Sequence, residues 1–254
     1  MRLFLCRLSA VMLFGIAACT QSPSEKTQTM TLERLLELHA DARGGKAALE
    51  SVNAVDIRIN ITEPTFVVEG HYRASREGRM RIDIFADGQR VFTEAMNVDK
   101  GWQMFGDSEI ADLSAEGEAA LRRGIESNLY ALHELPTLGY KLELLGETQR
   151  NGSVYWEVER TAPDGFSDHL FLEKASYLIA SSIETSALHP DLDSTQVRKE
   201  SLNSDFQEQD GIVFSRRSDT RNIETGEVVQ TIIVTARTLN PTLDPAQFER
   251  PAQE

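Results

Sequence analysis

The sequence predicts an α+β fold that is mainly β: an unclosed antiparallel β-barrel of about 10–12 strands, with helices packed in or across its concave face. Three observations support this prediction. Apolar and polar residues alternate along most of the chain after Asn53, turn signals such as Asp-Gly and Asn-Gly divide the alternating segments, and two stretches have helical periodicity. A sheet of that size twists and curls, so an apolar helix laid on its concave side would bury both surfaces.

The N-terminal segment 1–18 has the features of a lipoprotein signal peptide. Arg2 and Arg7 precede a short apolar run, which ends in small residues directly before Cys19. The run is shorter than the ~18–20 apolar residues that cross a bilayer, so it predicts a cleaved signal and not a membrane span. The pattern resembles a bacterial lipobox, in which the cysteine thiol receives diacylglycerol and the new amino group receives an acyl chain such as palmitate. In an ordinary signal peptide cut after Ala18, Cys19 would have no such role.

Thr20 bears on the destination of the protein. By resemblance to the sorting rule of Gram-negative cells, an aspartate at this position would mark the inner membrane, so Thr20 indicates the outer membrane, with the protein held on its periplasmic face. The polar segment 19–29 predicts a flexible tether. Residues 30–251 then form a single domain, because no repeat or linker divides them.

Composition excludes several classes of function. The formal charge of −14 makes nucleic acid an improbable partner, because phosphate binding needs clustered Lys and Arg. Cys6 leaves with the signal peptide and Cys19 carries lipid, so no thiol remains for a disulfide, a metal or a nucleophile. A hydrophobic content of 41% is consistent with a core that folds without such links.

Two helices are predicted before and within the sheet. The first starts after Thr31, which can cap it, and ends at Gly44-Gly45, with a short helical turn following at 46–52. The second starts after Ser114 and is ended by Pro136 and Gly139. The apolar stripe of the first helix consists of Leu32, Leu35, Leu36 and His39, and that of the second of Leu121, Ile125, Leu129 and Leu132.

The remaining segments alternate with a period of two and predict strands joined by hairpin turns, which is typical of an antiparallel meander. Those before the second helix are 55–62, 66–74, 80–85, 90–98 and 102–105, and those after it are 141–148, 154–160, 167–173, 178–185, 197–206, 212–221 and 228–238.

No residue pattern predicts catalysis, a cofactor or a resident metal. Ser167, Asp168 and His169 are adjacent on a strand and therefore point to opposite faces, and the chain has no Gly-x-Ser-x-Gly elbow. The histidines are scattered, and the loop around Asp191 and Asp193 lacks the glycine and glutamate of a calcium hand. We therefore expect a protein that is not an enzyme.

Hydrophobic binding is the function class that remains. A half-closed sheet presents alternate residues on its inner face, where they either line a ligand cavity or fill the core. The candidate ligand-binding residues are Ile57, Ile59, Phe66, Val68, Tyr72, Met80, Ile82, Ile84, Trp102 and Met104.

Four segments resemble the outer-membrane lipoprotein-sorting (LolA/LolB-like) superfamily. They are the helix and Arg-Gly-Gly of 38–49, the turn before a tryptophan at 99–103, the Asp-Gly hairpin of 209–212 and the closing segment 240–248. The resemblance covers roughly residues 30–251, and its motifs are structural turns and helix ends.

The resemblance implies an unclosed barrel with a helical lid and a cavity for acyl chains. We therefore expect an outer-membrane-anchored periplasmic lipoprotein that binds a hydrophobic ligand, either lipid or the acyl chains of lipoproteins. The alternative is a structural or regulatory envelope lipoprotein that uses the same scaffold to dock another protein, without ligand.

Overall fold

The computed structural model describes residues 29–98, 100–107 and 109–252. The predicted signal peptide, the lipidation residue Cys19 and nearly all of the tether lie outside the described residues.

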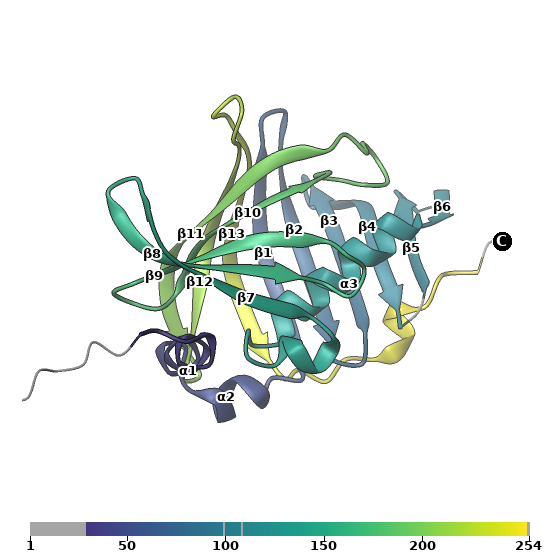
Figure 1. Ribbon diagram of the computed structural model, residues 1–254. Coiled ribbons are helices and arrows are strands. Elements are labelled where there is room, and N and C mark those ends of the chain that lie inside the picture. Colours follow the sequence, from purple (N-terminus) through teal and green to yellow (C-terminus); the bar gives the residue numbers. More distant parts are fainter. Residues whose placement is uncertain (1–28, 99, 108, 253–254) are drawn as a thin grey trace, which may run out of the picture.

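One 13-stranded antiparallel sheet makes up most of the structure, in the order β6-β5-β4-β3-β2-β1-β13-β12-β11-β10-β9-β8-β7. Its end strands β6 and β7 do not pair with one another, so the barrel is open, and the predicted fold class is confirmed. Figure 1 shows the sheet curling around α3. The strands are β1 (Ala54–Glu63), β2 (Phe66–Ser75), β3 (Arg79–Ala86), β4 (Gln89–Asn97), β5 (Lys100–Phe105), β6 (Glu109–Asp112), β7 (Lys141–Arg150), β8 (Ser153–Thr161), β9 (Ser167–Glu173), β10 (Ile179–Ser186), β11 (Val197–Gln209), β12 (Ile212–Asn222) and β13 (Val228–Leu239).

Asx-Gly turns set the register of three hairpins. In Asp87-Gly88, Asn151-Gly152 and Asp210-Gly211 both residues have positive φ, with values of 50° and 76°, 48° and 84°, and 53° and 77°. Two successive positive φ angles define the turn whose twist matches that of paired strands. Strand β6 was not predicted, because it is only four residues long and two of them are acidic.

The helices are α1 (Leu32–Ala42), α2 (Lys46–Glu50) and α3 (Ala115–Leu129), with short 3-10 turns η1 (Leu135–Leu138) and η2 (Pro245–Phe248). The predicted caps are confirmed: Thr31 accepts a hydrogen bond from the Arg34 amide, and Ser114 accepts one from Gly117.

The expectation that the second helix reaches Leu132 was wrong. Tyr130 is extended (φ −109°, ψ 136°), which ends α3 at Leu129. The turn lets the Tyr130 ring stack on the Arg76 guanidinium, 4.2 Å from the ring centroid, while Leu132 packs in a separate cluster beneath α1. The short helical turn after Gly45 likewise ends at Glu50, before the predicted residue 52.

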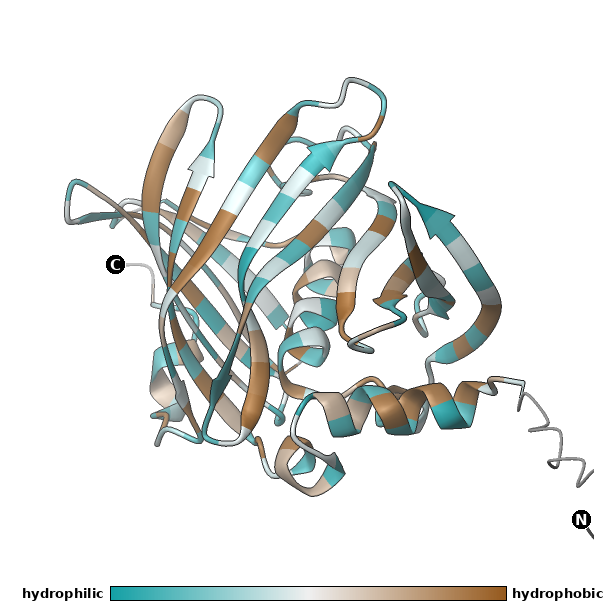
Figure 2. Cartoon of the chain, turned by 90° about the vertical axis from the view of Figure 1, so that its left-hand side faces the viewer, coloured by the Kyte–Doolittle hydropathy of each residue, from teal (hydrophilic) through white to brown (hydrophobic). Residues whose placement is uncertain are grey.

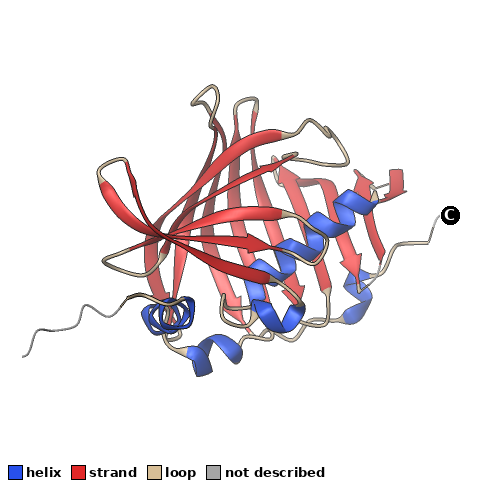
Figure 3. Ribbon diagram, in the orientation of Figure 1, coloured by secondary structure: helices blue, strands red, loops and turns tan. Residues whose placement is uncertain are grey.

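The apolar stripe of α3 fills the concave side of β1–β3. Leu121, Ile125 and Leu129 pack against β1 residues such as Ile57 and Ile59. Figures 1 and 3 show α3 lying across the inner side of the strands. Figure 2 shows the alternation of apolar and polar residues along the strands. The core of the sheet is therefore built under the helix.

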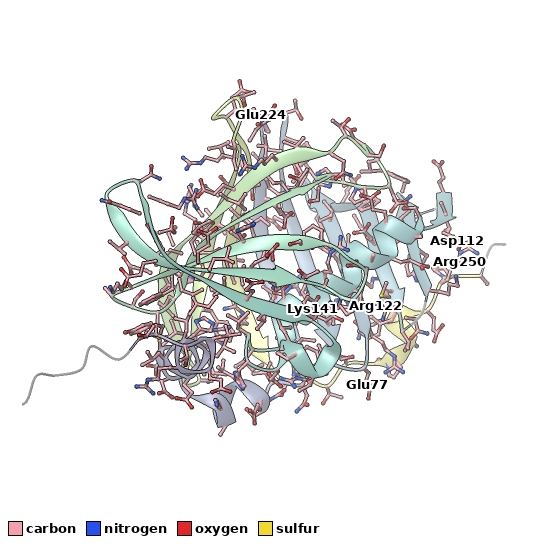
Figure 4. All side chains as sticks on the ribbon, viewed as in Figure 1. Glu77, Asp112, Arg122, Lys141, Glu224 and Arg250 are labelled. Carbon is pink, nitrogen blue, oxygen red and sulfur yellow. The ribbon has the colours of Figure 1, made fainter. Side chains whose placement is uncertain are left out.

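The C-terminal segment covers the opposite, convex face of β3–β5. The Trp102 indole donates a hydrogen bond to the Phe248 carbonyl at 3.0 Å, and both side chains are almost fully buried. Arg250 pairs with Asp112 of β6 at 3.5 Å, and Figure 4 shows these two at one edge of the molecule. The closing segment thus covers the convex face of this end of the sheet, whereas α3 lies on its concave side.

The turn between α1 and α2 packs against the β11–β12 hairpin and is hydrogen-bonded to it. Arg43 holds Val213 twice: its carbonyl accepts from the Val213 amide at 3.0 Å, and its Nε donates to the Val213 carbonyl at 3.2 Å. Gly44, with φ 114°, lies so close that a Cβ there would be 1.9 Å from the Gly211 carbonyl oxygen. Gly45 has φ 94° but open space around it.

This difference gives a matched pair of substitutions. We expect Gly45→Ala to lower the free energy of unfolding by about 1–3 kcal/mol through backbone strain alone. Gly44→Ala carries the same kind of strain, and the collision with Gly211 should add a further ~1–3 kcal/mol. Urea unfolding followed by circular dichroism measures both. Equal losses in the two variants would show that the contact with Gly211 does not constrain this turn.

Candidate functional site

A cleft of about 370 Å³ lies between α3 and the inner face of strands β8 and β10–β13. We call it the main cleft. It lies on the side of α3 that faces away from the core of β1–β3. Its lining comprises Glu116, Ala120, Arg123, Gly124, Ser127, Tyr140, Arg160, Ala162, Phe166, Glu184, Ser186, Ala187, Leu188, Pro190, Lys199, Ser201, Ser218, Thr220, Gln230 and Ile232.

The α3 wall of the main cleft includes three small residues. Ala120, Gly124 and Ser127 recur at helical spacing on the face opposite the apolar stripe. At Gly124 a Cβ would meet no atom within 4 Å, so the helix backbone borders open space there. Because the apolar stripe of α3 packs onto the sheet, the residues on the opposite face of the helix line the cleft.

The sheet wall contains a buried ion pair. Arg160 Nε and Nη2 donate to the two oxygens of Asp168 at 2.9 and 2.5 Å, and Asp168 is only 1% exposed. Burial opposes the charge on Arg160, but its hydrogen bonds to Asp168 outweigh that effect and raise its pKa above the ordinary value. The bidentate geometry holds both side chains rigidly at the cleft wall.

Lys199 is the second buried cation of the sheet wall, at 6% exposure. Its Nζ donates to the Ala187 carbonyl at 3.0 Å and lies 3.4 Å from a carboxylate oxygen of Glu184. Burial lowers the pKa of Lys199, and Glu184 opposes that shift. On the helix side, Arg123 pairs with Asp164 and stacks on Phe166, 4.2 Å from the ring centroid.

These contacts decide what the main cleft can hold. Each of its three cations already has a carboxylate partner, so the walls offer a ligand hydroxyl groups and apolar surface more than free charge. The hydroxyls come from serines such as Ser127 and Ser186, and the apolar surface from Leu188 and Ile232. Such mixed walls suit an amphiphile.

The ten predicted ligand-binding residues lie elsewhere. Eight of them share the concave face of β1–β3, as the pairing of Ile57 with Tyr72 and of Tyr72 with Ile82 shows. Phe66, at the rim, is 43% exposed. The other seven belong to the core under α3, and none of the ten borders the main cleft: Ile57, Ile59, Val68, Tyr72, Met80, Ile82 and Ile84.

Trp102 and Met104 were expected on the same inner face, and that expectation was wrong. Trp102 pairs with Ala95 and Met104 with Thr93, whereas the residue opposite the core residue Met96 is Gly101. Both side chains therefore point to the convex face, where Trp102 lies beneath the C-terminal segment. Their side of the sheet depends on the length of the turn after β4, which alternation within one strand does not reveal.

Sequence reasoning missed the polar wall of the main cleft. Lys199, Ser201 and Asn203 alternate on β11, and Ser182, Glu184 and Ser186 do so on β10. These polar alternations were a usable signal. The prediction of a hydrophobic inner face did not include them.

The adjacent Ser167, Asp168 and His169 make separate contacts. Asp168 is held by Arg160, whereas Ser167 donates to Glu159 at 3.2 Å and His169 Nδ1 lies 2.8 Å from Glu157. Within the described ranges, no group of three or more His, Cys, Asp or Glu side chains could hold a metal ion. No helix in the described part of the chain is both long and apolar enough to cross a bilayer.

Comparison with known proteins gives similarity in structure alone. No protein-family profile matches the chain, and no curated protein matches it in sequence. A solved LolA superfamily protein from Nitrosomonas europaea superposes with a TM-score of 0.57 at 15% identity, covering 87% of this chain and 99% of that one. A domain from Vibrio parahaemolyticus, described as an outer membrane lipoprotein-sorting protein domain, gives 0.59 at 14% identity, with 85% and 96% covered.

A third structure, a DUF1329 family protein from Desulfovibrio piger, gives a TM-score of 0.57 at 15% identity, covering 87% of this chain and 98% of that one. These superpositions span nearly the whole of each solved chain, so they compare complete folds. At such low identity they establish the architecture and not the ligand. The resemblance found in the sequence is confirmed at this level: the chain has the fold of the LolA superfamily.

Proposed function

We propose that this chain is an envelope lipoprotein that binds an amphiphile, either a lipid or the acylated end of a lipoprotein, in the main cleft. The observation that carries the proposal is a cleft of about 370 Å³ on the concave side, bordered by the bare backbone at Gly124. Its volume falls within the ~300–1,000 Å³ of small-molecule sites. Each methylene that a ligand buries there contributes about 0.8 kcal/mol.

The shape of the cleft supports binding without covalent chemistry. Its three cationic side chains are held in ion pairs, such as Arg160 with Asp168, and are therefore not free to exchange protons with a substrate. The likeness to a lipoprotein-sorting protein domain supports the same class of ligand. The acyl chain would lie along Leu188 and Ile232, with its polar end among the serine hydroxyls.

The proposal includes the location inferred from the sequence. Acylated Cys19 would anchor the chain in the outer membrane, on its periplasmic face, and residues 20–29 would span the distance to the domain. Two or more acyl chains are enough for stable anchoring. A chain fixed in this way fits a receptor or resident binder better than a shuttle.

Gly124 gives a direct test of the main cleft. We expect Gly124→Trp to fill it and to reduce bound lipid at least ~10-fold, because the side chain would point into space that no other atom occupies. Gly124→Ala is the matched control: it leaves the cleft open and should stabilise α3 by about 0.5–1 kcal/mol. Lipid is extracted from the full chain purified from envelopes and is counted by mass spectrometry.

Two outcomes would contradict the proposal. One is a wild-type protein that stays free of lipid both after purification and after incubation with vesicles. The other is equal lipid content in the wild type and in Gly124→Trp, when circular dichroism shows that both proteins are folded.

A second candidate function, docking of another envelope protein, is favoured by an exposed apolar rim. Val67, Leu192 and Val228 are 69%, 56% and 51% exposed. Glu63 brings their three segments together, because its carboxylate lies 2.9 Å from His189 Nε2 and accepts from Gln230 Nε2 at 2.8 Å. An apolar rim of this kind is typical of a protein contact.

A photo-crosslinking residue at position 67 tests this rim in living cells. If the rim docks a partner, Val67 replaced by the photoreactive residue should give one discrete crosslinked band. The matched control is Leu145, which is 47% exposed on edge strand β7. Absence of a band at Val67, or identical bands at both positions, would exclude a specific partner at the rim.

A further inference from the structure

A second, smaller cavity of about 150 Å³ lies beside the main cleft and shares Ala120, Leu188 and Pro190 with it. We call it the small cavity. Strands β4 and β5, the first half of α3 and the loop 187–196 enclose it. Its lining is Phe92, Glu94, Gln103, Gly117, Ala120, Leu121, Leu188, His189, Pro190, Asp191 and Leu192.

Three side chains bring oxygen acceptors to the small cavity. Glu94 and Gln103 stand directly opposite one another on β4 and β5, and Asp191 comes from the loop. Gln103 is 7% exposed, and its Oε1 has no hydrogen-bond partner among the described residues. Asp191 uses Oδ1 to accept from the Ser114 amide at 2.8 Å, while its Oδ2 is buried without a described partner. Buried acceptors in native proteins are normally paired, so these need a donor.

The charges around the small cavity are negative. Asp191 and Glu94 are both carboxylates, and His189, the one basic side chain of the described lining, is 2.9 Å from Glu63. The α3 residues that face Glu94 are uncharged, as is Ile82, its partner on β3. Burial, and secondly the charge of Asp191, raise the pKa of Glu94 to about 7. A bound cation would counter the negative charge of Asp191. Its own positive charge would also compensate for the burial of the Glu94 carboxylate.

We propose that the small cavity binds a primary ammonium group. An ammonium has three N–H donors and no acceptor, which matches the carboxylate of Glu94, Oε1 of Gln103 and Oδ2 of Asp191. Phe92, Leu121 and Leu188 supply apolar contact for the carbon attached to the nitrogen. A divalent metal fits less well, because Ca²⁺ takes 6–8 oxygen ligands and much of this lining is apolar. The proposal does not depend on the function proposed for the main cleft.

Calorimetric titration of the full chain carrying Cys19→Ser, which removes the lipid anchor, tests this site. The probes are butylammonium, butyltrimethylammonium, which lacks N–H donors, and 1-butanol, which lacks charge. We expect butylammonium to bind at least ~10-fold more tightly than the other two. Equal binding of the ammonium and trimethylammonium probes would overturn the proposal, as would binding of CaCl₂ that displaces butylammonium.

Substitutions locate the binding. Glu94→Gln should weaken butylammonium at least ~10-fold, and Gln103→Leu should weaken it to a smaller extent, because it removes a neutral acceptor. The matched control is Glu69→Gln, which makes the same charge change at an exposed position of β2 whose residue pairs with Asn60, outside the small cavity. Circular dichroism confirms the fold of each variant. Unchanged affinity in Glu94→Gln would overturn the assignment.

The pH dependence adds an independent measurement. The probe stays protonated throughout, since an alkylammonium has a pKa of about 10. Raising the pH from 6 to 8.5 ionises Glu94 and should strengthen binding several-fold in the wild type but not in Glu94→Gln. A Glu94→Gln variant with the full wild-type pH dependence would count against this site.

Two further titrations distinguish the possible sources of the amine, a lipid headgroup and a free amine. Vesicles of phosphatidylethanolamine, against phosphatidylcholine, test a lipid headgroup, and spermidine tests a free amine. Binding of either that is lost in Glu94→Gln supports the site and names its source. If neither competes with butylammonium, both of these sources of the amine are excluded.

Discussion

The packing of one amphipathic helix onto an open sheet is the constraint on which the rest of this structure depends. An unclosed sheet of 13 strands leaves its concave apolar face without a partner, and α3 covers the part formed by β1–β3. Because Leu121, Ile125 and Leu129 must face that core, the opposite side of the helix is turned toward β8 and β10–β13. The main cleft is the space that remains on that side.

The two halves of the concave face therefore have different chemistry. Where α3 covers β1–β3 the face is apolar and filled, whereas around the main cleft it carries buried ion pairs such as Arg160 with Asp168. A buried pair of this type adds little net stability, because desolvation of the two charges offsets their attraction. Its bidentate geometry nevertheless fixes the positions of the two side chains in the cleft wall.

The start of α3 connects the two cavities. Asp191 caps this end through the Ser114 amide, and its Oδ2 lies against Gly117, where an added Cβ would be 1.8 Å away. Ala120, one turn further on, borders both the main cleft and the small cavity. The loop 187–196 therefore contributes side chains to the walls of both spaces.

The sequence by itself determined the local elements of this protein. The sequence predicted the helix caps at Thr31 and Ser114, the Asx-Gly turns and the period-two strands, because each of these depends on residues a few positions apart. The inner-face assignment of Ile57, Ile59 and Tyr72 also followed from alternation within paired strands. Together with the resemblance of its turns and helix ends, these patterns were enough for the fold class.

Only the tertiary structure decided which of those faces is core and which is cavity. Trp102 and Met104 face the convex side because the turn after β4 sets their register, and the apolar inner residues are covered because α3 packs on them. Glu94 and Gln103 are paired across the β4–β5 hairpin, but no spacing in the chain indicates that Asp191 joins them. The approach of the Asp191 loop depends on how the long sheet curls, and therefore on contacts between residues far apart in sequence.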